Sequence, residues 1–280
     1  MENEPGRPAR TNAWTFKQGL TGNALKMLGA ALMVFDHLHE FIFTTAAYPG
    51  AVWMNMLGRL VLPIFLFMCA EGFFYTSNRK RYLLRLLIGF WVMNLGDWAL
   101  SAAFPLSNID LSARPQLMNN VFGTMFMVAF YLLLIEFFKA GIREKKALKI
   151  AGGALLLLAP VAFAVAVFFL MSVPVVGTMI FLLVPNLLLV ESSFIFVAIG
   201  IAFYCLRRWR WAQVSVLAAY SMVHFIAGLG SGDIQWMMIF AVIPLLMYNG
   251  KRGGGSKYFF YVFYPAHIWL FYLLAWLLQR

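Results

Sequence analysis

The chain has 280 residues, of which 62% are hydrophobic and 12% charged, and its formal net charge is +11. Soluble domains have about 45–50% apolar and about 25% charged residues, so this composition excludes an ordinary water-soluble fold. Since the basic residues gather in short clusters between apolar runs, the positive charge indicates orientation in a membrane rather than binding of nucleic acid.

We predict two parts, a polar cytoplasmic tail over residues 1–22 and a single transmembrane domain over residues 23–280. The tail lacks the apolar core and the small-residue cleavage site of a signal peptide, so we expect the first hydrophobic helix to stay in the mature protein. Cys69 and Cys205 both lie within apolar runs, which favours buried, inert thiols over a disulfide.

Apolar runs of about 18–25 residues recur from residue 24 to the end of the chain, and each can cross a hydrocarbon core of roughly 30 Å. The sequence therefore predicts an all-α, polytopic transmembrane helix bundle with about nine crossings. The predicted spans are residues 24–45, 51–76, 82–104, 117–138, 148–171, 174–206, 211–228, 234–249 and 258–278.

The stretch 174–206 is long for one helix and has Pro185, Asn186 and Glu191 near its middle. Two full crossings here would put the basic cluster 207–210 on the side opposite to the other clusters. We therefore expect one crossing plus a broken or re-entrant piece, which protein must shield because lipid leaves backbone polar groups unsatisfied. A bundle with ten crossings is the alternative.

Nearly all lysines and arginines fall in alternate loops, as the positive-inside rule requires if the N-terminus is cytoplasmic. The clusters are Arg7/Arg10/Lys17/Lys26, Arg79/Lys80/Arg81/Arg85, Lys139/Arg143/Lys145/Lys146/Lys149, Arg207/Arg208/Arg210 and Lys251/Arg252/Lys257. The intervening loops, near Pro49, Asp110, Val173 and Gly230, contain one basic residue, Arg114. This pattern predicts a multi-pass membrane protein with a cytoplasmic N-terminus.

Ionisable residues at bilayer depth cost several kcal/mol and usually mark function. The first predicted helix carries Asp36, His37 and Glu40, which lie within about 100° of one another around the helix axis. His37 is about 16 Å along the helix from Lys26, and His267 has a similar depth in the last helix. These depths predict that the two histidines meet in one site. In the alternative, each histidine only donates to a neighbouring carbonyl.

The predicted spans also contain the charged residues Arg59, Glu71 and Asp97. Arg59 and Asp97 both fall in the outer half of the bilayer, so we expect them to form an ion pair. Glu71 falls in the inner half, level with Lys26 and Arg85, and a buried carboxylate there needs a basic partner. In the structural alternative these pairs only brace the helices.

We predict no metal site. His37 and His39 project to different sides of one helix, and the sequence has neither the His-Glu-x-x-His nor the Cys-x-x-Cys spacing. We expect His39 and His224 to be structural.

Four segments carry a recognisable combination of residues. They are Asn23-Ala24-Leu25-Lys26 running on to Asp36-His37, then Gly58-Arg59-Leu60-Val61-Leu62-Pro63-Ile64-Phe65, then Ala70-Glu71-Gly72-Phe73 with Tyr82-Leu83-Leu84-Arg85-Leu86, and a tail from Pro244 through Asn249-Gly250-Lys251-Arg252-Gly253 to Tyr264-Pro265-Ala266-His267. Together they resemble the TraX family, membrane proteins tied to N-acetylation of conjugative F-type pilin. Residues 140–230 contribute little, and Glu191 stands where an aspartate is expected.

The chain also resembles transmembrane acyltransferases, among them acyltransferase family 3 and the lysosomal heparan glucosaminide acetyltransferase. Family 3 has Arg-x10-His in its first helix, where this sequence has Lys26-x10-His37. The family's Phe-rich helix ends in Ser-Gly, and here Glu71-Gly72 takes that place. The resemblance implies a protein of the bacterial inner membrane that transfers an acetyl group from cytosolic acetyl-CoA. Its acceptor would be a pilin, another peptide, a glycan or a lipid.

Acyl transfer needs a base for the acceptor and donors for the developing oxyanion. His37 suits the base, Asp36 or Glu40 is placed to hold its tautomer, and His267 is a second catalytic candidate. The phosphates of CoA need several cations. We expect them to be bound by Lys26, Arg79, Arg85, Lys251 and Arg252.

Two other functions are compatible with the same residues. In a proton-coupled transporter or lipid-handling protein, the Asp36-His37 pair would relay protons. The hydropathy shows no inverted repeat, which argues against a transporter. The chain would otherwise be a structural component of conjugation.

Overall fold

The computed structural model describes residues 19–44, 51–109, 114–255 and 258–279, and within these ranges it is helical, with no β-sheet. The all-α helix bundle predicted from the apolar runs is thereby confirmed. Most of the predicted polar tail, residues 1–22, lies outside the described residues.

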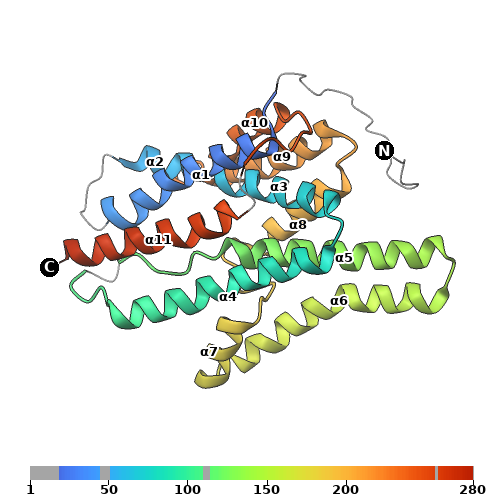
Figure 1. Cartoon of the computed structure of the whole chain (residues 1–280), viewed down its shortest axis with the longest axis horizontal. Helices are drawn as coiled ribbons and strands as arrows, with labels where there is room; N and C mark the ends of the chain where they lie inside the picture. Colours follow the sequence, from blue (N-terminus) through green and yellow to red (C-terminus); the bar gives the residue numbers. More distant parts are fainter. Residues whose placement is uncertain (1–18, 45–50, 110–113, 256–257, 280) are drawn as a thin grey trace.

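The helices follow the predicted spans in order, with boundaries that differ by a few residues (Figure 1). Their bounds are α1 Gly22–Leu38, the π-helix η1 His39–Phe43, α2 Val52–Gly58, α3 Val61–Tyr75, α4 Arg79–Ala103, α5 Val121–Arg143, α6 Ala147–Leu170, α7 Pro174–Leu183, α8 Ser193–Cys205, α9 Arg210–Ala227, the 3-10 helix η3 Gln235–Ala241, α10 Val242–Leu246 and α11 Phe259–Leu278.

Among the described residues, five helical segments are long and apolar enough to cross a membrane. They are Val52–Tyr75, Arg79–Ala103, Val121–Arg143, Ala147–Leu170 and Phe259–Leu278. Shorter apolar helices, such as α7 and α8, lie between them. The chain is therefore a multi-pass membrane protein by the length and composition of its helices, and the number of nine crossings stays a prediction.

The long stretch 174–206 is broken, as its sequence predicts. Helix α7 ends at Leu183, α8 begins ten residues later at Ser193, and the segment between them is irregular. Carbonyls at the end of α7 lack helical partners. Trp91 Nε1 donates to the Leu183 carbonyl at 2.7 Å, and Asn94 Nδ2 donates to a second carbonyl of this turn at 2.9 Å. Helix α4 thus shields the break.

The loops that carry the basic clusters gather at one end of the bundle, on the right in Figure 1. This basic end comprises residues 19–26, 76–85, 139–149, 206–210 and 247–255. The backbone N–H of Gly22 donates to the Lys251 carbonyl at 2.8 Å, and the N–H of Asn23 donates to the Arg252 carbonyl at 2.9 Å. The start of the first helix is thereby attached to the loop before the last one, as alternate basic loops predict.

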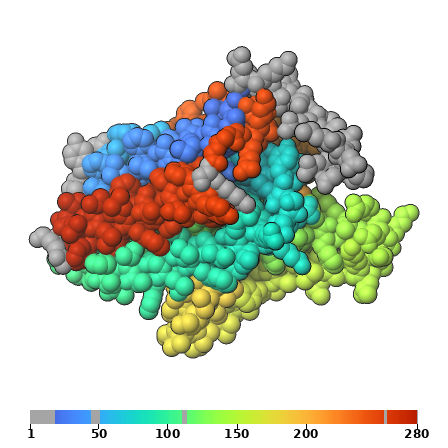
Figure 2. Space-filling view, viewed as in Figure 1, coloured from blue at the N-terminus to red at the C-terminus, as the bar shows by residue number. Residues whose placement is uncertain are grey.

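Apolar side chains cover the outside of the bundle, and several polar ones lie inside it. Helix α6 turns Leu155 and Phe168 outward, and α7 projects beside it from the surface in Figure 2. The interior buries His37, Asp97 and His267, among other polar residues. Polar groups that face inward in an apolar bundle are expected to form the functional site.

Candidate active site

The first helix changes its geometry where its ionisable residues lie. The regular helix α1 ends at Leu38, and the π-helix η1 begins at His39. A π-helical turn holds more residues than an α-helical one and is frequent at functional sites. Asp36 and His37 therefore belong to the last turn of α1, whereas Glu40 belongs to the wider turn that follows.

His37 and His267 meet inside the bundle, as their similar depth predicts. His37 Nδ1 lies 2.8 Å from His267 Nε2, and the two rings stack with centroids 4.9 Å apart. Both residues are buried, with 5% and 7% of their surface exposed. His267 Nδ1 lies 2.7 Å from the carbonyl oxygen of Phe263, one turn earlier in α11. The alternative, a bond from each histidine to a neighbouring carbonyl, is wrong for His37, whose ring nitrogens contact His267 and Asn119, and is confirmed for His267.

The proton positions along this series of hydrogen bonds follow from its last acceptor, the Phe263 carbonyl. The Phe263 carbonyl can only accept, so His267 Nδ1 carries a proton and Nε2 of the neutral ring does not. His37 Nδ1 must then donate to His267 Nε2, which leaves His37 Nε2 unprotonated. Asn119 Nδ2 donates to this free nitrogen at 3.2 Å. His37 therefore presents an unprotonated nitrogen on the side opposite to His267.

The two carboxylates of the first helix reach His37 differently from what we predicted. Glu40 Oε2 accepts from Asn119 Nδ2 at 2.9 Å, so one amide lies between Glu40 and the ring. Asp36 Oδ1 instead contacts Arg59 Nη2 at 3.5 Å and Asn55 Nδ2 at 3.4 Å. Among the described residues, neither carboxylate bonds to the imidazole directly, because the two ring nitrogens are taken by His267 and Asn119.

The predicted ion pair between Arg59 and Asp97 is wrong. Arg59 follows the end of α2, and α2 packs against α1, which brings its guanidinium to Asp36. Asp97 lies on the face of α4 that packs against α11, where its Oδ1 accepts from Trp269 Nε1 at 2.8 Å. The two residues were predicted at a similar depth in the membrane, but they contact different helices.

Gly58 permits the close approach of α2 to α1. A Cβ atom at this position would overlap the carboxyl group of Asp36. The Gly58-Arg59 pair therefore brings the backbone and then the guanidinium against the same carboxylate. This explains why these two residues stand together in the sequence.

The predicted basic partner of Glu71 comes from another part of the chain. Glu71 accepts a hydrogen bond from the Tyr248 hydroxyl, and its strongest cationic neighbour is Arg210 at the start of α9. The Arg210 guanidinium also lies 4.6 Å from the Phe67 ring. Glu71 thus connects three segments near the basic end, where a bracing role fits better than a catalytic one.

His37 lines a polar cavity of about 730 Å³. Its charged and polar lining includes Asp36, His37, Glu40, Asn55, Arg59, Asn119, Glu191, His224, Asp233 and Gln235. Arg59 Nη1 donates to Gln235 Oε1 at 3.3 Å, and His224 Nδ1 lies 2.8 Å from Asp233 Oδ2. The cavity has room for a substrate and holds several groups that bind polar ligands.

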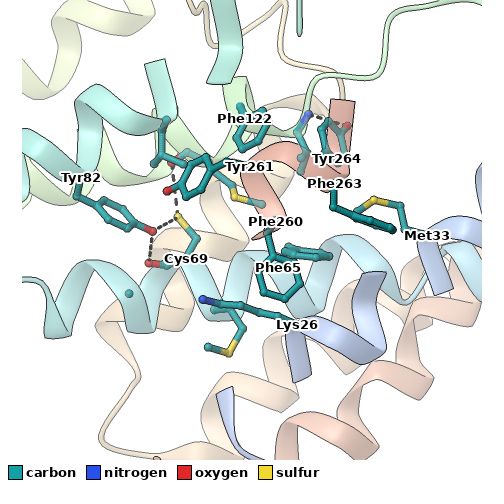
Figure 3. Close-up of a pocket in the computed structure, with 15 residues that line it drawn as sticks. Lys26, Met33, Phe65, Cys69, Tyr82, Phe122, Phe260, Tyr261, Phe263 and Tyr264 are labelled. Carbon is teal, nitrogen blue, oxygen red and sulfur yellow. Dashed lines mark hydrogen bonds between the residues drawn. The ribbon is translucent and has the colours of Figure 1, made fainter. Parts of the chain in front are cut away.

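A smaller, apolar cavity of about 120 Å³ lies next to the polar cavity, and Figure 3 shows the residues that line it. Lys26 and the aromatic rings of Phe65 and Phe260 line it, and Tyr82 donates to the Cys69 carbonyl at 3.2 Å beside them. Its wall includes Met33, Val121 and Tyr264, which also line the polar cavity. These three residues therefore separate the two spaces.

A third space, the amide cavity, has a volume of about 440 Å³ and shares Asn119 and Glu191 with the polar cavity. Asn94, Asn120 and Asn186 also line it. Helix α4 and the broken segment after α7 thus form a side chamber next to His37.

The residues predicted to bind CoA all lie at or near the basic end but differ in availability. The Lys26 ammonium lies 5.8 Å from the Phe260 ring in the apolar cavity. Arg85 contacts the Tyr82 ring of the same wall at 5.9 Å. Lys251 and Arg252 have exposed side chains. Arg79 forms an ion pair with Glu136 of α5, so its charge is already balanced.

Sequence reasoning missed Asn119, Tyr264 and the His224–Asp233 pair. Asn119 precedes α5, and Asn120 beside it is a polar residue at the start of an apolar run, which was a usable signal. Tyr264 was noticed only as part of the tail motif, yet its hydroxyl accepts from the Val121 N–H at 3.2 Å. The partner of His224 lies in a loop, where spacing along a helix gives no information.

Comparison with known proteins gives one family and one relative. A family model described as TraX protein matches residues 21–275. The chain is 26% identical over 266 residues to the probable fimbrial assembly protein FimC, serogroup H1, of Dichelobacter nodosus. That alignment covers 87% of this chain and 91% of the relative. No solved structure matches the chain.

Proposed function

This chain belongs to the TraX protein family, and we propose that it is an integral membrane acyltransferase that uses acetyl-CoA. The acetyl group would pass to an amine or hydroxyl of a membrane-associated or exported acceptor. The observation that carries this proposal is the series of hydrogen bonds from His267 through His37 to Asn119, in which Nε2 of a neutral His37 ring accepts. His37 lines a polar cavity that shares Met33, Val121 and Tyr264 with an apolar cavity lined by Lys26.

The order of the two cavities supports a separate entrance for each substrate. Acetyl-CoA is a cytosolic compound whose phosphates need cations, so the basic end would face the cytoplasm and bind the nucleotide. Lys26, Lys251 and Arg252 are the cations best placed there. The thioester arm would lie along the apolar cavity and pass Tyr264 to reach His37.

In the proposed reaction the acceptor N–H or O–H replaces Asn119 as the donor to His37 Nε2. The acceptor lone pair attacks the thioester carbonyl carbon, a C–N or C–O bond forms, and the carbonyl π electrons move to oxygen. The acceptor proton passes to His37 Nε2. The tetrahedral intermediate then expels the CoA thiolate by breaking the C–S bond, and the thiolate takes the proton from His37.

His267 helps His37 in this scheme without touching the substrate. When Nε2 of His37 gains a proton, the Nδ1 proton can shift toward His267 Nε2, so that two rings share the charge. Glu40, which is connected to His37 through Asn119, offsets that charge as a triad carboxylate does.

The same hydrogen-bond chain argues against the transporter hypothesis. A relay needs a group at each end that accepts and releases a proton. This series of hydrogen bonds ends at the Phe263 carbonyl, which only accepts a hydrogen bond. His37 can therefore exchange protons on one side only, toward the polar cavity, as a base in a reaction does.

A pilin-like peptide is the acceptor that the relative favours. The Dichelobacter nodosus protein is described as a probable fimbrial assembly protein, and the alignment covers nearly all of both chains. An acceptor that is assembled at the cell surface would approach from the end opposite to the basic loops. The polar cavity holds Asp233 and Gln235 from the loop at that end.

The proposal is tested with purified protein in lipid nanodiscs, isotope-labelled acetyl-CoA and a membrane extract as the source of acceptor. We expect release of free CoA thiol together with labelled acetyl groups on one class of acceptor, identified by mass spectrometry. The His37→Ala protein, matched for folded yield, is the control. Equal thiol release by both proteins, or none by folded wild-type protein, would contradict the proposal.

A further inference from the structure

Asn119 holds a position that neither the sequence motifs nor the family assign. It belongs to an extended segment, residues 114–120, that runs into α5. One amide nitrogen, Nδ2, lies 3.2 Å from His37 Nε2 and 2.9 Å from Glu40 Oε2. A carboxylate only accepts and the ring nitrogen is unprotonated, so each receives one of the two N–H groups.

We infer that Asn119 covers the catalytic base in the free protein and, once the acceptor displaces it, donates to the thioester oxyanion. This inference rests on the proposed acyl transfer. Asn119 would thereby be a catalytic residue that binds the reacting carbonyl oxygen, in addition to the base His37.

His37 Nε2 can accept one hydrogen bond at a time. This nitrogen has one lone pair, and the Asn119 N–H now occupies it. The acceptor N–H or O–H must take the same lone pair before it can be deprotonated. Asn119 therefore has to give up this hydrogen bond whenever the reaction begins.

The displaced N–H is then free next to the place where negative charge develops. In the tetrahedral intermediate the nucleophile and the oxyanion are bonded to the same carbon. A nucleophile at His37 Nε2 therefore puts the oxyanion close to the Asn119 amide, and a donor is effective at about 2.7–3.1 Å. The second N–H stays on Glu40 and keeps the amide in the cavity.

The residues around Asn119 hold its backbone firmly. Asn120 Nδ2 donates to the Phe90 carbonyl at 3.0 Å and to Asn94 Oδ1 at 2.5 Å. The N–H of Val121 donates to the Tyr264 hydroxyl at 3.2 Å. The held backbone and the hydrogen bond to Glu40 keep the amide in the cavity, so only the N–H that leaves His37 has to turn toward the oxyanion. A donor that needs little rearrangement is an effective oxyanion donor.

The first test compares the steady-state kinetics of Asn119→Ala and Asn119→Asp with those of the wild type. Asp keeps the shape of Asn but removes both N–H donors, so it also serves if the Ala variant folds poorly. We expect kcat to fall by about 10²–10³-fold, the usual loss for one oxyanion donor. KM for acetyl-CoA should change little, because the lost interaction exists only in the transition state.

Gln116→Ala is the matched control, since Gln116 is an exposed amide in the same extended segment. It should keep the wild-type kcat. A folded Asn119→Ala or Asn119→Asp protein with wild-type kcat would overturn the inference and leave the proposed function intact. A folded wild-type protein without any turnover would overturn both.

A second test measures whether Asn119 shields His37 Nε2 from a chemical reagent, and it does not require turnover. Diethyl pyrocarbonate modifies unprotonated imidazole nitrogens, and mass spectrometry of the peptide with His37 gives the rate. With the Asn119 N–H removed, we expect His37 to react faster in Asn119→Ala than in wild type or Gln116→Ala. Equal rates in all three proteins would show that Asn119 does not cover the base, and the inference would fail.

Discussion

Two histidines line the polar cavity, and they differ in burial and in partner. His37 is 5% exposed and contacts the neutral groups of His267 and Asn119. The side chain of His224 is 29% exposed, and its Nδ1 bonds to the Asp233 carboxylate at 2.8 Å. The direct carboxylate–histidine pair that we expected beside His37 thus occurs at the cavity rim instead.

The difference follows from the cost of burying charge. A buried ion pair loses the solvation of both partners, and its mutual attraction often does not compensate for the loss. At the rim, the side chains of His224 and Asp233 are 29% and 33% exposed, so the pair loses less solvation than a buried one would. In the bundle, a chain of neutral hydrogen bonds keeps Nε2 of His37 free to accept a proton. We therefore assign the base to His37 and a bracing role to His224.

The largest effect is expected for His37→Ala. Its turnover should be lower by about 10²–10⁴-fold, the usual contribution of a positioned base. Acetyl-CoA affinity should change little, since the nucleotide would bind about 15 Å away along the helix. Release of CoA thiol and equilibrium binding measure the two quantities. A folded His37→Ala protein with normal turnover would remove the first helix from the chemistry.

The next effect concerns the partner that distinguishes His37 from His224. His267→Ala removes the acceptor of the His37 Nδ1 proton, so the ring loses its fixed tautomer. We expect a turnover between those of wild type and His37→Ala. The double variant should be no slower than His37→Ala, because residues that act as a unit are not additive. Additive losses in the double variant would mean that the two rings act independently.

Depth along the helices was readable from the sequence, and adjacency between helices was not. The meeting of His37 with His267 was predicted because two rare ionisable residues share a depth. The same reasoning failed for Arg59 and Asp97, since residues at one depth meet only when their helices face each other. Which helix faces which depends on packing between distant segments, as the contact of α2 with α1 shows.

The helix bounds follow from local hydrophobicity and were predicted to within a few residues, whereas the number of crossings stays a prediction. The break after α7 was also readable, because Pro185 and the basic cluster after α8 both argued against two full crossings. Asn119 was missed because an asparagine beside an apolar run is usually a helix boundary residue. Its contacts with His37 and Glu40 come from a segment that is about 80 residues distant in the chain.

A moderate effect is expected for Arg59→Ala, which would remove a positive charge from the surroundings of His37. Asp36 would lose its cation and keep only the Asn55 amide as a partner. A partly buried charge left unpaired costs about 1–3 kcal/mol, so folded yield and thermal stability in detergent should fall. Arg208→Ala, which removes an exposed cation from a turn, is the control. Unchanged stability of Arg59→Ala would show that the pair with Asp36 contributes little.

A smaller effect tests whether acetyl-CoA approaches His37 from the basic end and not from the side of His224. Changing Lys251 and Arg252 together to Glu should weaken acetyl-CoA binding about tenfold, or about 1.4 kcal/mol, as expected for a few exposed charge contacts. The binding should also become less sensitive to salt. Unchanged affinity of the inserted double variant would limit these residues to setting the orientation in the membrane.

The smallest effect concerns the rim pair and depends on pH. Hydrogen bonds from His224 and from the Gln235 N–H lower the pKa of Asp233 below its usual value of 3.8. A lowered pKa stabilises the fold above the usual value, and this contribution is lost as the pH falls through the native pKa. Wild type should therefore exceed Asp233→Asn in stability by about 0.2–1 kcal/mol at pH 6, as for other exposed pairs, and by nothing near pH 2. Thermal unfolding in detergent at both pH values measures this.

Turnover should stay close to wild type, because this pair only braces the loop after α9. If Asp233→Asn instead loses as much turnover as His37→Ala, the base is His224 and the assignment of the two histidines must be exchanged.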